Sequence, residues 1–280
     1  MARQKYKEIK DHRHFICNLS VIPVFDKPDH HAVMKTQLLF GECGVVLQVK
    51  NKHWYRVSPD KLGIEGWVDT NQIMLIPETL YEKYSDNEAY LLDIFSIVLN
   101  NESPLPILMG SVLRKYDGMS FYMPDGQYIC NNLAVRPGEL ALTEEVLSKL
   151  AKKYINAPYL KGGRSHFGMD AGALLQAILK FFNFSLPILP ELQLDFGEVV
   201  DFIELSQPGD IVFFQDDNGT VDHCGLLLSK NKVIHSAGSV RIDKLDHYGI
   251  YNKEKKKYTH RLRIIKRVLE FEEKKKAPSD

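Results

Sequence analysis

The residues that could do chemistry are arranged around position 171. A glycine-rich turn, Gly162-Gly163-Arg164-Ser165-His166-Phe167-Gly168-Met169-Asp170-Ala171, leads into an apolar stretch that predicts a helix. A cysteine at such a helix start is a good nucleophile, because the helix N-terminus and a nearby histidine both favour its thiolate. Position 171 instead holds alanine. A methyl group cannot attack an amide carbon, so this one side chain decides whether the protein cuts anything.

Two histidines downstream of the turn supply the rest of a nucleophilic site. His223 lies in the strand-like run Val221 to Leu228, and His235 ends the run Val233-Ile234-His235. On neighbouring antiparallel strands, His223 would serve as the base and His235 would orient it. Two such histidines are more often structural. The order of glycine turn, helix start and two histidines is the more specific signal.

No other side chain replaces the missing thiol. Cys224 follows His223 directly, and alternate strand residues face opposite sides of a sheet, which predicts a buried, inert thiol there. Ser165 has no visible activator. The four cysteines are far apart and have no CxxC or metal-ligand spacing. They are expected to be reduced core thiols.

Composition excludes several function classes. Lys+Arg and Asp+Glu balance at 36 each over 280 residues, which argues against nucleic acid as a partner. No stretch approaches the roughly 18 apolar residues of a membrane span, and no hydrophobic segment follows the charged start Met1 to Glu8. We therefore expect a cytoplasmic protein without membrane contact. No zinc-like spacing or phosphate-loop pattern is present, so neither a metal nor a cofactor is predicted.

Hydrophobic patterning predicts an α+β chain of three units. Residues 15–78 show short alternating runs separated by turns, typical of a small antiparallel β-barrel, with another β sandwich as the alternative. Residues 79–141 predict a second compact β unit, opened by a helix over 79–90. Residues 142–269 predict helices packed on an antiparallel sheet, and 270–280 a charged, solvated tail.

The helices of the third unit have recognisable ends. Thr143 is a plausible N-cap before Glu144 and Glu145, and Pro158 ends this first helix, since a residue before proline disfavours helical geometry. The glycine turn follows, and then a second helix over 170–182.

The third unit resembles the NlpC-type peptidoglycan peptidases, which are papain-like enzymes of bacterial cell-wall turnover. Two bacterial SH3-type domains before such a unit are similar to the arrangement in γ-D-glutamyl-L-diamino-acid endopeptidases, which cut stem peptides between D-glutamate and diaminopimelate or lysine. The first SH3-type domain is matched by Ser20 to Val24, Gln37 to Glu42 and Gly66-Trp67-Val68. The matching segments of the third unit are Ala157-Pro158-Tyr159, Gly162 to Ser165, Phe167 to Asp170, Gln207 to Phe214, His223 with Gly225, Ile234 to Gly238, Val240 to Asp243 and the final strand Tyr258 to Ile265.

The resemblance implies a role for seven residues. Ala171 occupies the nucleophile position, His223 is the base and His235 the orienting third member. The substrate side of the groove is assigned to Tyr159, Asp170, Gly172 and Glu42. Asp170 would contact the amino end of the substrate, and Glu42 would reach the groove from a loop of the first β unit. The implied partner is a peptidoglycan stem peptide, and the SH3-type domains offer surfaces for a protein partner.

Several positions depart from the family's pattern. Lys161 stands where tryptophan is usual, Ala171-Gly172-Ala173 replaces Cys-Ser-Gly, and Ile188-Leu189 replaces an Arg-Asp pair whose aspartate holds the free amine of the peptide. Loss of such an aspartate is expected to weaken the binding free energy of the peptide by roughly a few kcal/mol. Glu191 is a candidate substitute.

Two explanations of Ala171 remain. One is a laboratory Cys-to-Ala change in a muropeptide endopeptidase of cell-wall recycling. The other is a natural pseudoenzyme that binds a muropeptide or a protein. The number of departures favours natural loss, because an engineer would change one residue. In either case the chain is predicted to be an inactive cysteine-peptidase scaffold.

Overall fold

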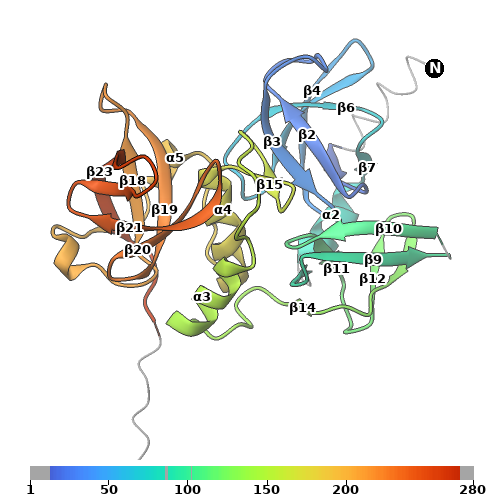
Figure 1. Ribbon diagram of the computed structural model, residues 1–280. Coiled ribbons are helices and arrows are strands. Elements are labelled where there is room, and N and C mark those ends of the chain that lie inside the picture. The colour runs from blue at the N-terminus through green and yellow to red at the C-terminus, as the bar shows by residue number, and fades with distance from the viewer. Residues whose placement is uncertain (1–12, 86–87, 102, 272–280) are drawn as a thin grey trace, which may run out of the picture.

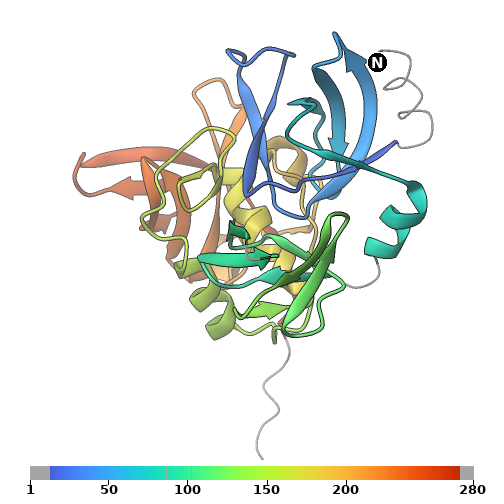
Figure 2. The same cartoon turned by 90° about the vertical axis from the view of Figure 1, so that its right-hand side faces the viewer.

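Three units surround one central helix in the computed structural model, which describes residues 13–85, 88–101 and 103–271. The helix α4 (Ala171–Leu179) lies where a first β unit, a second β unit and a C-terminal sheet meet (Figures 1 and 2). The predicted α+β class is confirmed. Most of the predicted charged tail lies outside the described residues. Among the helices of the described part, none is long and apolar enough to cross a membrane.

The first unit is an SH3-like barrel region, as predicted. Seven antiparallel strands pair in the order β3-β2-β6-β5-β4-β1-β7. Alternating apolar residues fill its core, with Val24, Leu38 and Val57 fully buried. Its strands are β1 (His14–Ile16), β2 (Val21–Phe25), β3 (Met34–Leu39), β4 (Cys43–Lys50), β5 (Trp54–Pro59), β6 (Gly66–Asp69) and β7 (Met74–Ile76).

The second unit consists of two small sheets, ordered β10-β9-β13-β12 and β11-β8-β14. That it is a second SH3-type domain stays a prediction. The strands are β8 (Glu88–Leu91), β9 (Phe95–Asn100), β10 (Ser103–Leu108), β11 (Val112–Arg114), β12 (Ser120–Met123), β13 (Gly126–Ile129) and β14 (Ala134–Val135).

The helix that opens the second unit is shorter than predicted. It is α2 (Glu78–Ser85), and Tyr90, which we expected at its end, lies on β8 instead. The Tyr90 ring packs edge-on against Phe181 at 5.7 Å, so a tertiary contact with the C-terminal unit overrides the local pattern.

The C-terminal unit is a closed antiparallel barrel with helices outside it. Its sheet order is β17-β23-β18-β19-β20-β21-β22, and β22 pairs back onto β23. The apolar residues of this sheet form two separate clusters, one on each face. One cluster packs against α4, and the other fills the interior of the barrel. The strands are β17 (Glu198–Val199), β18 (Ile211–Gln215), β19 (Val221–Ser229), β20 (Lys232–Ala237), β21 (Ser239–Asp246), β22 (Gly249–Asn252) and β23 (Lys257–Arg267).

Local sequence accounts for the helix ends. The Thr143 hydroxyl accepts from the backbone N–H of Val146 at 3.2 Å and so caps α3 (Glu144–Lys152). Asp170 caps α4, which continues through the 3-10 turn η1 (Lys180–Phe182) and stops at Asn183, whose φ is 59°. The glycine turn before α4 forms the two-residue strands β15 (Arg164–Ser165) and β16 (Gly168–Met169). Two further turns are α5 (Pro190–Gln193) and η2 (Ile203–Leu205).

Candidate active site

Ala171 is the first residue of α4 and is almost fully buried. It belongs to the same apolar cluster as Cys224, the neighbour of His223 in the chain. The turn before it is tied to the strand of the second histidine, because the Ser236 hydroxyl donates to the Met169 carbonyl at 2.7 Å. The helix α4 packs against β19 and β20, the two strands that carry the predicted histidines.

The structure joins the two histidines in one hydrogen-bonded line. His223 Nε2 lies 2.9 Å from His235 Nδ1, and His235 Nε2 lies 3.1 Å from Asp243 Oδ2. Arg241 holds that aspartate with contacts of 2.8 and 3.0 Å. Burial would raise the pKa of Asp243, but hydrogen bonds from His235 and Arg241 outweigh it and lower the pKa below the ordinary value.

This line of contacts decides where each proton sits. An ionised Asp243 can only accept, so His235 carries its proton on Nε2 and offers the lone pair of Nδ1 to His223. His223 then donates through Nε2, which leaves its Nδ1 with the lone pair that can accept a proton. Burial, reinforced by the nearby His235 and His260, holds the pKa of His223 well below its ordinary value. The imidazole is thus neutral and oriented as a base.

Strand alternation separates His223 from Cys224, as the sequence predicts. Cys224 is buried on the α4 face, where its Sγ contacts Gln193 Oε1 at 3.5 Å. Burial raises the pKa of that thiol far above its ordinary value. Gly225 lies opposite His235 on the neighbouring strand, and a Cβ there would approach the His235 Cβ to 3.1 Å and the Ile234 carbonyl to 2.9 Å. A glycine at 225 therefore leaves the space in which His235 reaches His223.

A third imidazole, which sequence reasoning did not select, completes the cluster. His260 on β23 stacks on His223 with ring centroids 4.3 Å apart, and its ring is 5.3 Å from that of His235. Burial, with a smaller contribution from His235, lowers the pKa of His260 to about 4. Its spacing from the other two histidines carries no signal, because the barrel closure brings β23 beside β18 and β22.

Tyr159 and Asp170 lie beside the start of α4. Tyr159 is 45% exposed, and burial together with the charges of Asp170 and Asp222 raises the pKa of its hydroxyl. Asp170 uses one carboxylate oxygen to accept from the Ala171 N–H at 2.7 Å and the other from the Gly162 N–H at 2.6 Å. The helix cap and the glycine turn thus share this carboxylate, and its contact with a substrate stays a prediction.

Glu42 lies in an ion pair between the first β unit and the C-terminal unit. Its carboxylate accepts two hydrogen bonds from Arg164, at 2.6 and 2.9 Å, and Lys180 Nζ lies 3.6 Å away. Arg164 is 1% exposed and also donates to Gln176 on α4 at 3.0 Å. The structure therefore puts Glu42 in a buried ion pair between units. A role in holding a substrate remains a prediction.

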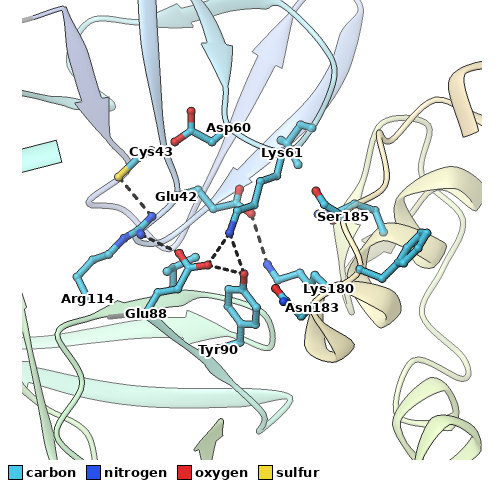
Figure 3. A pocket seen from close by; sticks show the side chains of 14 residues that line it. Glu42, Cys43, Asp60, Lys61, Glu88, Tyr90, Arg114, Lys180, Asn183 and Ser185 are labelled. Atoms are coloured by element: carbon cyan, nitrogen blue, oxygen red, sulfur yellow. Dashed lines mark hydrogen bonds and ion pairs between the residues drawn. The ribbon is translucent and has the colours of Figure 1, made fainter. Parts of the chain in front are cut away.

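This ion pair borders a charged cavity of about 160 Å³ where the three units meet (Figure 3). Lys180 points from the end of α4 toward Glu42, donates to the Gly110 carbonyl at 2.7 Å and lies 4.6 Å over the Tyr90 ring. On the opposite wall, Glu88 pairs with Arg114 at 2.8 Å. Ion pairs from the three units therefore meet at this cavity and link the units through charge.

The stability of the protein is expected to fall in acid through Glu42. Burial alone would raise the pKa of Glu42, but Arg164 and Lys180 outweigh it and lower the pKa from 4.5 to about 2. The stabilisation is complete above the unfolded-state pKa and is lost as pH falls from about 4.5 to 2, on the order of 3 kcal/mol. Urea unfolding of the wild type and E42Q between pH 6 and 3 measures this. An equal acid slope in both proteins would contradict it.

The segment that replaces the family's Arg-Asp pair is packed into the fold. Ile188 is buried in the core cluster of the first β unit, and its N–H donates to the Leu62 carbonyl at 3.0 Å. The same segment lies on the start of α4: a Cβ at Gly172 would come within 2.1 Å of the Ile188 carbonyl oxygen. Gln193 joins the two by donating to the carbonyls of Gly172 and Pro187 at 3.0 and 2.7 Å. The departures at 172 and 188 thus fit each other.

Comparison with known proteins supports this description. Residues 156–263 match the NlpC/P60 family, and residues 24–73 match the bacterial dipeptidyl-peptidase SH3 domain. A γ-D-glutamyl-L-lysine dipeptidyl-peptidase of Bacillus subtilis is 24% identical over 220 residues, covering 73% of this chain and 72% of that protein. One of the same description from Bacillus cereus is 31% identical over 97 residues, covering 34% of this chain and 29% of that protein.

A solved structure shows the same fold over nearly the whole chain. The crystal structure of an NlpC/P60 family protein from Bacillus cereus aligns with a TM-score of 0.78 at 20% identity, covering 92% of this chain and 100% of that one. The predicted NlpC-type unit and an SH3-type unit before it are confirmed. The chain therefore carries an NlpC/P60 domain behind a bacterial SH3 domain and is homologous to the γ-D-glutamyl-L-lysine dipeptidyl-peptidases.

Proposed function

We propose that this chain binds the γ-D-glutamyl–diamino-acid part of a peptidoglycan stem peptide without cutting it. The observation that carries the proposal is Ala171 at the start of α4, combined with an intact line of contacts from His223 through His235 to Asp243. The substrate class comes from the dipeptidyl-peptidase relatives. A scaffold that keeps its oriented base and lacks a nucleophile can hold a peptide but has no group to attack it.

The packing around Gly172 supports natural loss over a laboratory substitution. A serine, usual at this position in the family, would collide with the Ile188 carbonyl. Ile188 in turn belongs to the core of the first β unit, where an arginine would bury a charge without a partner. Changing residue 171 alone does not produce this set of contacts. The predicted cytoplasmic location would make soluble muropeptide fragments the available ligand.

Calorimetric titration tests the proposal. We expect the stem tripeptide L-Ala-γ-D-Glu-diaminopimelate to bind and to be recovered intact. The isomer with an α-linked glutamate has the same composition and charge, and we expect it to bind more weakly. The variant Y159A should weaken binding by about two- to twelvefold, because an aromatic contact contributes roughly 0.5–1.5 kcal/mol.

A matched variant controls for loss of any exposed tyrosine. Tyr248 is 62% exposed and lies in the turn between β21 and β22, so Y248A should bind as the wild type does. Absence of binding by both stem isomers, or equal binding of the two, would overturn the proposal. Release of free diaminopimelate-containing fragments would contradict its non-cleaving part.

A further inference from the structure

Three imidazoles from three strands meet at one place in the C-terminal barrel. His223, His235 and His260 each offer a ring nitrogen, and these nitrogens all lie within 4.8 Å of one another. The strands that carry them are β19, β20 and β23. Two of the imidazoles are buried and the third is half-buried. Such a cluster is more than an orienting pair requires, because His223 and His235 already satisfy each other.

His235 and His260 each have a polar partner for the ring nitrogen that points away from the cluster. His235 gives Nε2–H to Asp243, so its Nδ1 carries the lone pair. His260 Nδ1 lies 2.9 Å from the Thr259 hydroxyl, and that hydroxyl can in turn donate to the Ile250 carbonyl at 3.5 Å. With its proton on Nδ1, His260 offers the lone pair of Nε2 to an ion. Metal-binding histidines characteristically donate their second nitrogen in this way to a carboxylate, carbonyl or hydroxyl, which fixes the tautomer.

We propose that His223, His235 and His260 together bind a divalent transition-metal ion, zinc by preference. Zinc binds imidazole nitrogen at about 2.0–2.1 Å, so two tetrahedral ligands lie about 3.3 Å apart. The His223–His235 nitrogen distance of 2.9 Å is already close to this value. The ring nitrogen of His260 lies within 4.8 Å of the other two, and a shift of this ring brings it to the same separation. When the ion binds through His223 Nε2, the proton that this nitrogen donates to His235 moves to His223 Nδ1, so the imidazole stays neutral.

The surroundings suit a catalytic-type zinc geometry with three protein ligands. A cavity of about 810 Å³ is lined by His235 and His260 and by charged side chains of both signs, and it gives an ion a path from solvent. The fourth coordination position is left for water or a small ligand. Three histidines and an outer-shell carboxylate form a donor set that zinc prefers, because imidazole suits it and the carboxylate raises ligand basicity.

Titration of the full chain with Co²⁺ and Zn²⁺ tests the site. We expect one ion per chain, a tetrahedral ligand-field spectrum with Co²⁺, and displacement of Co²⁺ by Zn²⁺. H260A should weaken binding by more than the roughly 10–100-fold that loss of an outer-shell partner costs, and D243N by about that amount. The matched control is H247A, which removes an exposed histidine outside the cluster.

A second measurement keeps the test independent of variant folding. In the wild-type protein, Zn²⁺ should protect the half-buried His260 from diethylpyrocarbonate, while the exposed His247 stays reactive. Absence of metal binding, binding that H260A and H247A affect equally, or protection that excludes His260 would each overturn the proposal. Stem-peptide binding is measured without metal, so the two proposals can fail separately.

Discussion

Replacing Ala171 with cysteine is expected to create a thiol that iodoacetamide alkylates on the order of 100-fold faster than any native cysteine of the chain. The reason is local. Position 171 begins α4, where the N-terminus favours an anion, and β19 beside it carries an imidazole already oriented as a base. Alkylation rates by mass spectrometry of the intact A171C protein measure the effect without any assumption about the substrate.

The native cysteines provide a quiet background for this experiment. All four are buried and unpaired. Burial raises the pKa of Cys17 to about 12 and that of Cys43 to about 11, and it raises the pKa of Cys130 and Cys224 as well. In the double variant A171C/H223A, most of the increase in alkylation rate at position 171 should be lost. Equal alkylation of A171C and the wild type, or no effect of H223A, would show that His223 does not serve position 171.

For the same reason, the wild type and A171C are expected to differ in the hydrolysis of stem peptides. Loss of a nucleophile from a hydrolytic triad costs on the order of a million-fold in turnover, so the wild type should release nothing from stem peptides above the buffer background. Cleavage by A171C would show that residue 171 alone accounts for the loss of peptidase activity. A reactive thiol without cleavage would place part of the loss in the Ile188-Leu189 segment, where the family holds the amine of the peptide.

The parts of the fold that could be predicted rest on short-range patterns. Strand alternation separated Cys224 from His223. The apolar run after the glycine turn predicted a helix from about residue 170, and α4 begins at Ala171. Tyr90 was misassigned because its ring is held by Phe181, a residue far along the chain that no local pattern contains.

The parts of the site that could not be predicted depend on closure of the barrel and on contacts between units. His260 joins the cluster only because β23 closes the sheet against β22. Arg164 reads as an ordinary turn residue in the sequence, yet it is buried against Glu42 from the first unit. The local sequence does not distinguish a surface glutamate from a glutamate in a buried ion pair. Only the placement of the units separates them.

The variant R164M is expected to destabilise the protein by about 3–5 kcal/mol, because it leaves the Glu42 carboxylate buried with Lys180 as its remaining cationic partner. Arg164 also donates to the Gln37 carbonyl at 2.8 Å, and the backbone N–H of Arg164 donates to the Gln37 side chain at 2.9 Å. These contacts attach the turn before α4 to strand β3 of the first unit. The loss should therefore appear both as a lower free energy of unfolding in urea and as faster hydrogen exchange over residues 160–170.

A second substitution separates the buried charge from the lost packing. In E42Q/R164M the amide needs no cationic partner, so much of the stability should return, since removing both charges of a buried pair costs less than removing one. The matched control is R136M at an exposed arginine, which should change stability by less than about 0.5 kcal/mol. If R164M behaved like R136M, the ion pair would not hold the units together. If the double variant were as unstable as R164M, packing of the long arginine side chain, and not its charge, would be what joins α4 to the first unit.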